Sequence, residues 1–296
     1  MPRAAVLSIH ARVGGTEPAT WEDPSLIQLW GPRYQLYVVA REDLAPFSLG
    51  RLPDDAKGRA KAEDLAARLH EMLAGRTTMT YGEAGARMGV HGNQLRYAAS
   101  TGTVLIRWAG ARAPTIWTVP RPAIEPFDAR LELARRYLNF YGPTTAAAFA
   151  KWAAISPAQA RAAFEALGPE LTPVRTAIGD GWILSVDEPG FRAPAGTAAP
   201  ARLLPSGDSY FLFWGADREL LVPEADRRDA LWTSRVWPGA VLAGGEIVGT
   251  WRRDGANVSV EGWRRLTAGE RSAIEAEAAS LPLPDLRTDI RVRWDE

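Results

Sequence analysis

One order of predicted elements recurs along the chain: helix, turn, helix, then a two-stranded ribbon. The clearest copy spans residues 54–120. A first helix is predicted over 57–73, because Leu65, Leu69 and Leu73 recur at helical spacing and share one apolar face. The recurrence of this order predicts small modules placed in tandem.

The rest of this copy carries clear boundary signals. Thr80, with Glu83 three residues later, has the pattern of a capping box at the start of a second helix. Asn93 is predicted to cap a third helix over 94–101, which Gly102 ends. Two strands follow, at 103–108 and 115–119. Three helices followed by a hairpin are the winged helix-turn-helix layout, in which the third helix reads the major groove of DNA.

A second copy is predicted over 126–189. Its first helix is predicted at 128–141, a short second helix begins after a cap at Thr144 or Thr145, and a third lies at 157–167. The two strands of its ribbon are predicted at 171–177 and 182–186. A third copy at the front is incomplete. A helical stretch at 4–13 precedes a hairpin of strands at 26–30 and 34–39, and the other helices of the module are missing.

After Pro189 the composition changes. Residues 190–200 are rich in Ala, Gly and Pro and are predicted to be a linker. Short strands then follow at 202–204, 210–214, 240–243, 246–252 and 257–263, with one helix at 268–281. We therefore predict an α+β protein of tandem winged helix-turn-helix modules followed by a small β-barrel-like domain. The predicted domains are an incomplete first winged helix at 1–50, complete ones at 51–122 and 123–196, and the β-rich domain at 197–296.

Charge and composition exclude several classes of protein. The net charge is zero, whereas a basic domain is the usual sign of nucleic-acid binding. The basic side chains are almost all arginine, which suits phosphates and base edges, although a GC-rich genome would give the same composition. The chain has no cysteine, so it has no disulfide or thiolate metal site. It has no apolar run of membrane-spanning length, and we expect a cytoplasmic monomer without membrane contact, metal or small-molecule cofactor.

The third helix of the clear copy carries the best candidates for DNA contact. Asn93, Gln94 and Arg96 are expected to point outward, and these side-chain types pair with adenine and guanine edges. Arg107 and Arg112 lie on or beside the ribbon, where phosphate or minor-groove contacts are expected. A solvated helix face and loop are the alternative. The full set of predicted residues that contact double-stranded DNA is Asn93, Gln94, Arg96, Arg107, Arg112, Arg33, Gln159 and Arg161; for the alanine-rich helix with Gln159 and Arg161, a role in structure and spacing is favoured.

Motifs of common enzyme classes are missing from the sequence. The three histidines are far apart, and there is no Walker loop, dinucleotide fingerprint, Gly-x-Ser-x-Gly or His-Glu-x-x-His. Asp208 stands in an otherwise apolar segment, where it is a candidate general base or water-positioning group, or the cap of a turn. Six of the twelve tryptophans fall on apolar strand or helix positions and are predicted to lie in the core: Trp30, Trp108, Trp117, Trp152, Trp182 and Trp251.

Several stretches in order resemble a bacterial family of winged-helix proteins, the AlkZ/YcaQ-like DNA glycosylases for alkylpurines and interstrand crosslinks. Residues 7–15 are similar to the family's Leu-x-x-x-Ala-Arg-Val-x-Gly stretch, 134–152 to its last winged helix, and 202–210 and 248–252 to its C-terminal domain. The resemblance implies three winged helices and a small β-barrel around duplex DNA. It also implies cleavage of the N-glycosidic bond of alkylated bases, with a Gln-x-Gln or Gln-x-Asp motif that positions or activates water.

The sequence departs from the family at two places that matter for catalysis. The Gln-x-Gln motif is expected just before Met1 and is absent. The family's Arg-Gly-Thr-Leu-His stretch is replaced at 33–37, where Tyr34 and Tyr37 are bulky. No catalytic residue is therefore assigned. We hypothesise that the start is internal, because a winged helix without its first helices would leave Val6, Leu7 and Ile9 uncovered; the DNA upstream of Met1 tests this.

Three functions remain open at this point. The first is DNA binding without catalysis, by a divergent member of a repair-glycosylase-like family. The second is a monofunctional DNA glycosylase for alkylated or crosslinked bases whose catalytic segment lies outside this sequence. The third is a protein-interaction role for the modules, which suits the neutral charge. A glycosylase assay separates the first two, and salt-dependent DNA binding separates both from the third.

Overall fold

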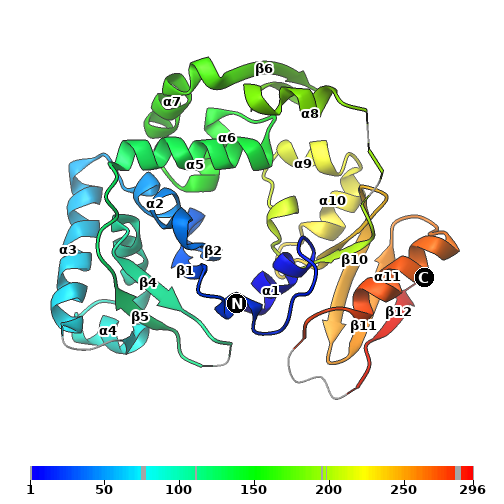
Figure 1. Ribbon diagram of the computed structural model, residues 1–296, viewed down its shortest axis with the longest axis horizontal. Coiled ribbons are helices and arrows are strands. Elements are labelled where there is room, and N and C mark those ends of the chain that lie inside the picture. Colours follow the sequence, from blue (N-terminus) through cyan, green and yellow to red (C-terminus); the bar gives the residue numbers. More distant parts are fainter. Residues whose placement is uncertain are drawn as a thin grey trace. The chain divides into compact units, whose positions relative to one another are not determined.

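A computed structural model describes residues 2–74, 78–110, 112–194, 196–197, 199–283 and 288–295. The chain forms two units, one of Glu22–Ala193 and one that combines Pro2–Trp21 with Pro194–Glu296. Both contain helices and small sheets (Figure 1), so the predicted α+β class is confirmed. Positions 195 and 198 of the predicted linker lie outside the described residues.

The first unit begins with a hairpin. Strands β1 (Leu26–Trp30) and β2 (Leu36–Ala40) pair antiparallel, with Trp30 opposite Leu36. Their tight turn contains the 3-10 helix η2 (Pro32–Tyr34). Short helical turns then lead toward the next group: η1 (Thr20–Glu22) precedes the hairpin, and η3 (Arg41–Asp43), α2 (Leu44–Phe47) and η4 (Leu49–Arg51) follow it.

The second group of elements forms a compact body of helices on a three-stranded sheet. Its elements are α3 (Ala56–Leu73), β3 (Met79–Thr80), α4 (Tyr81–Arg87), η5 (Gly92–Thr101), β4 (Val104–Arg107) and β5 (Thr115–Thr118). Strand β5 lies between β3 and β4. Leu69, Leu95 and Ile116 are fully buried in one core where α3, η5 and the sheet meet. The side chain of Thr80 accepts a hydrogen bond from the Glu83 amide and so fixes the start of α4.

The third group repeats this order. It comprises α5 (Pro126–Tyr141), α6 (Ala146–Ala153), α7 (Pro157–Ala166), η6 (Gly168–Glu170), β6 (Leu171–Thr176) and β7 (Gly179–Leu184), followed by η7 (Ser185–Asp187) and α8 (Glu188–Arg192). A bridge between Thr144 and Trp182 adds a short third strand position beside β7. Thr145 caps α6, and a capping box of Ser156 and Gln159 begins α7.

Two local predictions in this unit are wrong. The cap of η5 is His91, whose ring accepts from the Asn93 amide at 3.2 Å, so the helix begins earlier than expected and Asn93 lies within it. Trp182 is not a core residue, because its side chain is 39% exposed. Successive side chains on a strand point to opposite faces. The face of β7 with Gly181 and Ile183 is covered, whereas the opposite face is open at Trp182 and becomes covered only at Leu184.

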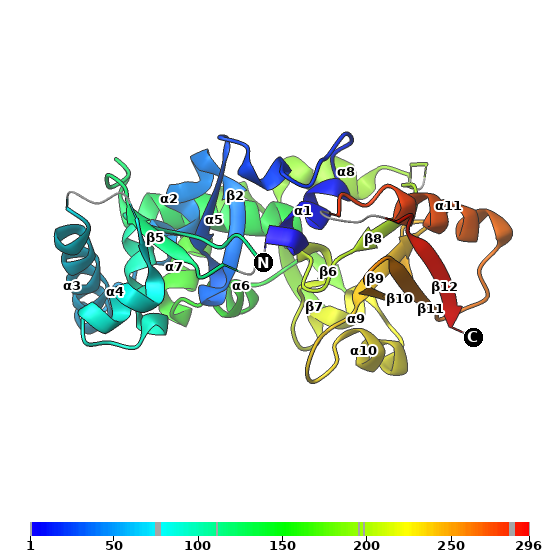
Figure 2. The same ribbon diagram turned by 90° about the horizontal axis from the view of Figure 1, so that it is seen from below.

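The second unit is built on a five-stranded sheet of order β12-β11-β10-β9-β8 (Figure 2). The strands are β8 (Arg202–Leu204), β9 (Gly239–Ala243), β10 (Glu246–Asp254), β11 (Asn257–Gly262) and β12 (Arg291–Asp295). Neighbouring strands are antiparallel except β11 and β12, which run parallel. The predicted barrel is wrong: among the described residues β8 and β12 are the two edges of an open sheet, and no pairing joins them.

The apolar side chains of this open sheet are buried by packing against helices. Residues of α11 (Ala268–Ala279), among them Ile274 and Ala278, share a core with Val241 and Val258 of the strands. The predicted strand at 210–214 is wrong, because Asp208 caps the 3-10 helix η8 (Ser209–Phe211) there. Two further short helices, α9 (Asp217–Leu221) and α10 (Ala225–Leu231), complete the connection to β9.

The N-terminal helix α1 (Pro2–His10) belongs to the second unit. Val6 and Leu7 are only 3% and 5% exposed, and Leu7 lies in the core of the five-stranded sheet and α11. The expectation that these two side chains are uncovered is therefore wrong. The segment predicted as one incomplete module, residues 1–50, is divided between the two units, because the apolar face of α1 packs on strands that follow it by about two hundred residues.

Candidate nucleic-acid interface

Helix η5 presents a polar face at its first turn. Asn93 and Gln94 are exposed, while Leu95, Ala98 and Ala99 are buried against α3 and α4. This division follows from helical spacing, because the three apolar side chains share one face. Both amides of this turn are therefore available to a ligand that lies along the helix.

The hairpin beside η5 carries two of the predicted arginines. Arg112 is exposed in the loop between β4 and β5. Arg107 is half exposed, and its guanidinium lies 3.0 Å from the carboxylate of Glu22. An exposed ion pair of this kind contributes little to stability.

Arg96 occupies a different environment from the two amides. It is half-buried, and its guanidinium lies 5.5 Å from the ring centre of Tyr34 and 5.3 Å from that of Tyr97. The two rings meet edge to face at 5.0 Å. On the exposed side, the ammonium of Lys61 lies 4.2 Å from the Tyr97 ring centre. Tyr34 belongs to the front hairpin, so this contact joins Arg96 to a segment that the sequence analysis placed in a separate module.

Arg51 contacts the Tyr34 ring from the protein interior. Its guanidinium lies 4.7 Å from the Tyr34 ring centre. Only 2% of Arg51 is exposed, and it donates to the carbonyl oxygens of Trp30 at 2.8 Å and Ala153 at 2.9 Å. Among the described residues its Nη2 has no hydrogen-bond partner. Burial without a carboxylate lowers the pKa of Arg51 to about 10, because desolvation disfavours the charged form.

We call Tyr34, Arg51, Lys61, Arg96 and Tyr97 the cation–aromatic cluster. Its aromatic groups respond to their surroundings in opposite ways. Burial raises the pKa of Tyr34. A hydrogen bond from Arg96 lowers the pKa of Tyr97, since it favours the phenolate. Except for Arg96, sequence reasoning missed this cluster; bulky Tyr34 at the position of the family's glycine was the available signal.

The backbone at Tyr34 is unusual. Arg33 and Tyr34 have φ values of 54° and 56°, the left-handed region that residues with a Cβ rarely adopt. Two such residues in succession store strain of about 1–3 kcal/mol each, which surrounding contacts must offset. Here the contacts are those of the Tyr34 ring with Arg51, Arg96 and Tyr97.

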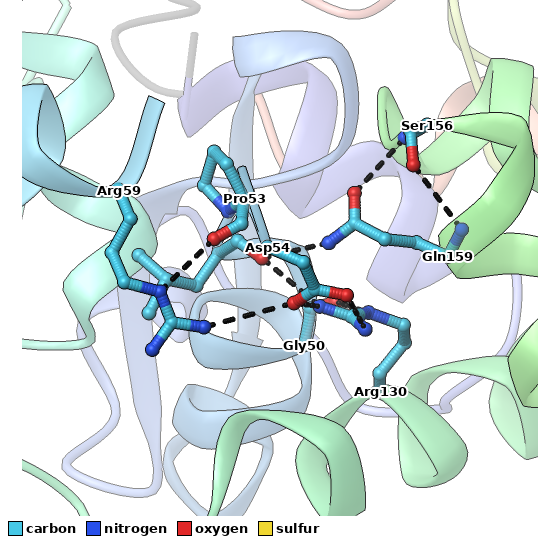
Figure 3. A network of polar contacts seen from close by, with 8 residues as sticks. Gly50, Pro53, Asp54, Arg59, Arg130, Ser156 and Gln159 are labelled. Atoms are coloured by element: carbon cyan, nitrogen blue, oxygen red, sulfur yellow. Dashed lines mark hydrogen bonds and ion pairs between the residues drawn. The ribbon is translucent and has the colours of Figure 1, made fainter. Parts of the chain in front are cut away.

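Gln159 is not a surface residue, contrary to the prediction. It is 6% exposed, and its side chain donates to the Leu52 carbonyl at 2.9 Å while accepting from the Ser156 amide at 3.1 Å (Figure 3). Helical spacing suggested an outward position, but the side chain of Gln159 points toward Leu52, next to the turn η4 that packs on α5. Arg161, one half-turn later, is exposed.

The same junction contains Arg130, which is 1% exposed. It donates to the Gly50 and Leu52 carbonyls at 3.0 and 2.9 Å and to both carboxylate oxygens of Asp54 at 2.9 and 3.0 Å (Figure 3). Arg130 therefore fixes the segment that carries Arg51 against α5, and it is structural rather than a DNA contact.

Asp208 in the second unit is held by neighbouring groups. Its side chain is fully buried, both oxygens accept from Arg12 at 2.8 and 3.0 Å, and one also accepts from the Tyr210 amide at 2.8 Å. The geometry supports the turn-cap interpretation. A carboxylate with both oxygens engaged is poorly placed to activate water.

The described residues contain no group of three or more His, Cys, Asp or Glu that could hold a metal ion. No helix within the described ranges is long and apolar enough to cross a membrane.

Comparison with known proteins defines the family. The family profile described as DNA glycosylase AlkZ-like matches residues 1–282. A search among curated proteins found no match. Among solved structures, the chain is similar to Streptomyces sahachiroi DNA glycosylase AlkZ, with a TM-score of 0.78 and 21% sequence identity over 99% of this chain and 89% of that chain. At this identity the likeness establishes the fold, and the profile establishes the family: the chain belongs to the AlkZ-like DNA glycosylase family.

Proposed function

We propose that this protein binds duplex DNA through winged helix-turn-helix modules and that the module at 56–118 contacts the bases. The order of its elements supports this: a helix, a short strand, two helices and a hairpin, with the short strand paired to the second hairpin strand. The group at 126–184 has the same order, with the Thr144–Trp182 bridge in the place of the short strand.

The observation that carries the proposal is the exposed pair Asn93 and Gln94 on η5. Such amides form two hydrogen bonds with adenine in the major groove. In the winged-helix docking geometry, η5 would lie in that groove and Arg112, on the β4–β5 loop, would reach the backbone. Arg112 then contributes affinity without sequence preference.

Gel-shift titrations with duplex DNA at several salt concentrations test this proposal. Wild-type protein is expected to bind with a log K that falls linearly with log salt. The double substitution of Asn93→Ala and Gln94→Ala is expected to weaken binding by at least about fivefold, which corresponds to about 1 kcal/mol, the lower end of the range for one lost bidentate contact. Asn139→Ala removes an exposed amide from α5 and serves as the control. Equal affinity of the double variant and the control would exclude η5 as the reading helix.

The family match favours a second candidate, excision of an alkylated or crosslinked base. An alkylated purine is cationic and a good leaving group, so modest activation of water suffices. A duplex that carries 7-methylguanine tests it through release of the free base, measured by chromatography. Binding without release would favour DNA binding alone, and release would favour glycosylase activity. Sedimentation of the free protein tests the expected monomer.

A further inference from the structure

The cationic side chains of the first unit differ in their partners. Many arginines lie within ion-pair distance of a carboxylate: Arg59, Arg68, Arg87, Arg107, Arg130, Arg135, Arg136, Arg175 and Arg192. Arg51, Lys61 and Arg96 have no carboxylate at that distance in the part of the chain that the structure describes. In a chain of zero net charge, three such cations on two tyrosine rings form a local excess of positive charge.

The rings hold these cations without neutralising them. A tyrosine ring attracts a cation through its electron-rich face and carries no net charge, whereas a carboxylate would cancel the charge and compete with an anionic ligand. Lys61 is exposed and Arg96 half-buried, so both can meet a ligand from solvent. Arg51 is buried behind Tyr34 and adds positive potential from the interior.

The strained turn at Tyr34 indicates that its side chain is needed. Glycine would adopt a φ of 56° without strain. A residue with a Cβ persists in this conformation where surrounding contacts hold it, and such positions cluster at functional sites. Backbone hydrogen bonds hold the turn, among them that from the Tyr34 amide to the Gly31 carbonyl at 2.9 Å. The Tyr34 ring adds contacts with Arg51, Arg96 and Tyr97, and two of these three partners are cations.

We propose that Lys61 and Arg96 of the cation–aromatic cluster bind one phosphate of the DNA backbone and that Tyr34 is a positioning residue that holds Arg96 for this contact. This rests on the proposed function and deepens it. The guanidinium supplies directed N–H donors and the ammonium a mobile point charge, the two usual partners of a phosphate oxygen. Arg96 is thereby assigned to the backbone, whereas Asn93 and Gln94 remain at the bases.

Four single substitutions test the assignment by duplex-DNA binding across a salt series, with thermal unfolding measured in parallel. Lys61→Met removes the ammonium from an exposed position and leaves a side chain that can pack on Tyr97. It is expected to lower the salt slope of log K by up to about 0.9, the value for one whole phosphate, because Arg96 still contacts the same phosphate. Lys151→Met removes the same charge from the exposed face of α6 and is expected to leave the slope unchanged.

Tyr34→Gly removes the ring and relieves the left-handed backbone. It is expected to lower the salt slope by a similar amount while the unfolding midpoint changes little, because the relieved backbone strain offsets the lost ring contacts. Tyr34→Phe keeps the ring and is expected to bind like wild type. A purely structural Tyr34 would instead show a lower unfolding midpoint with an unchanged salt slope.

The outcomes separate the two proposals. If wild type binds and both Lys61→Met and Tyr34→Gly keep its salt slope, the phosphate site is refuted while DNA binding stands. A slope reduced equally by Lys151→Met would also refute it, since any lost charge would then suffice. If wild type shows no salt-dependent binding, the proposed function itself fails.

Discussion

Replacement of Arg130 by methionine should destabilise the first unit by roughly 3 kcal/mol. The buried Gly50 carbonyl loses the donor at 3.0 Å, which costs about 1–3 kcal/mol. The Leu52 carbonyl keeps the Gln159 amide as a donor, so its loss is smaller. Asp54 is 53% exposed and returns to water, so its separated ion pair adds at most about 1 kcal/mol.

Differential scanning calorimetry of the full chain measures this effect. For a unit of this size, 3 kcal/mol corresponds to a midpoint lower by roughly 6–12 °C. Arg135→Met is the matched control on the same helix, because Arg135 pairs with Glu132 and Glu170 at the surface. Its expected cost is under about 1 kcal/mol. If Arg130→Met lowers the midpoint no more than Arg135→Met does, the contacts of Arg130 with Gly50 and Asp54 (Figure 3) do not stabilise the first unit as argued.

Two further predictions concern the second unit. The side-chain hydrogen bond from Arg264, with that from the Thr267 amide, lowers the pKa of Glu270 from 4.5 to about 2. A carboxyl with a depressed folded-state pKa adds stability that is present above pH 4.5 and is lost as the pH falls toward 2. Unfolding of wild type and Glu270→Gln across this range should therefore show a difference that disappears near pH 2, and a constant difference would contradict it. Gly239→Ala would place a Cβ 2.5 Å from the Leu204 carbonyl oxygen, where Trp251 Nε1 donates at 2.8 Å; chemical denaturation should show a loss on the order of 3 kcal/mol, and an unchanged midpoint would contradict it.

Local signals predicted most helices and strands, because they act within a few residues. Thr80 caps α4 as predicted, Thr145 is the one of the two predicted residues that caps α6, and Gly102 ends η5 with a φ of 75°. Where an element was predicted wrongly, a side-chain hydrogen bond to the backbone favoured a different local structure. Asp208 bonds the Tyr210 amide and turns an apolar stretch into a 3-10 helix, where alternation alone suggested a strand.

Long-range packing limited the rest of the prediction. The apolar face of α1 gives no indication that its partners lie beyond residue 200, so Leu7 was expected to be uncovered. Gln159 has the outward spacing of a DNA contact, but the carbonyl it bonds belongs to Leu52, 107 residues earlier. The cation–aromatic cluster joins residues from four separate segments of the chain, and no single motif contains them.

The zero net charge argues against DNA binding when composition alone is considered. The ion pairs in the structure show that the positive charges are not all neutralised equally. Many arginines are neutralised by a carboxylate that lies beside them in the fold. Arg130 and Asp54 form such a pair although they are 76 residues apart, so the sequence alone does not show which arginines are neutralised. After these pairs are set aside, the cations without carboxylate partners include Arg96 and Lys61 beside η5 and Arg51 behind them. A neutral protein can therefore present a basic surface over one helix, and its affinity for DNA should depend steeply on salt although its overall charge gives no long-range attraction.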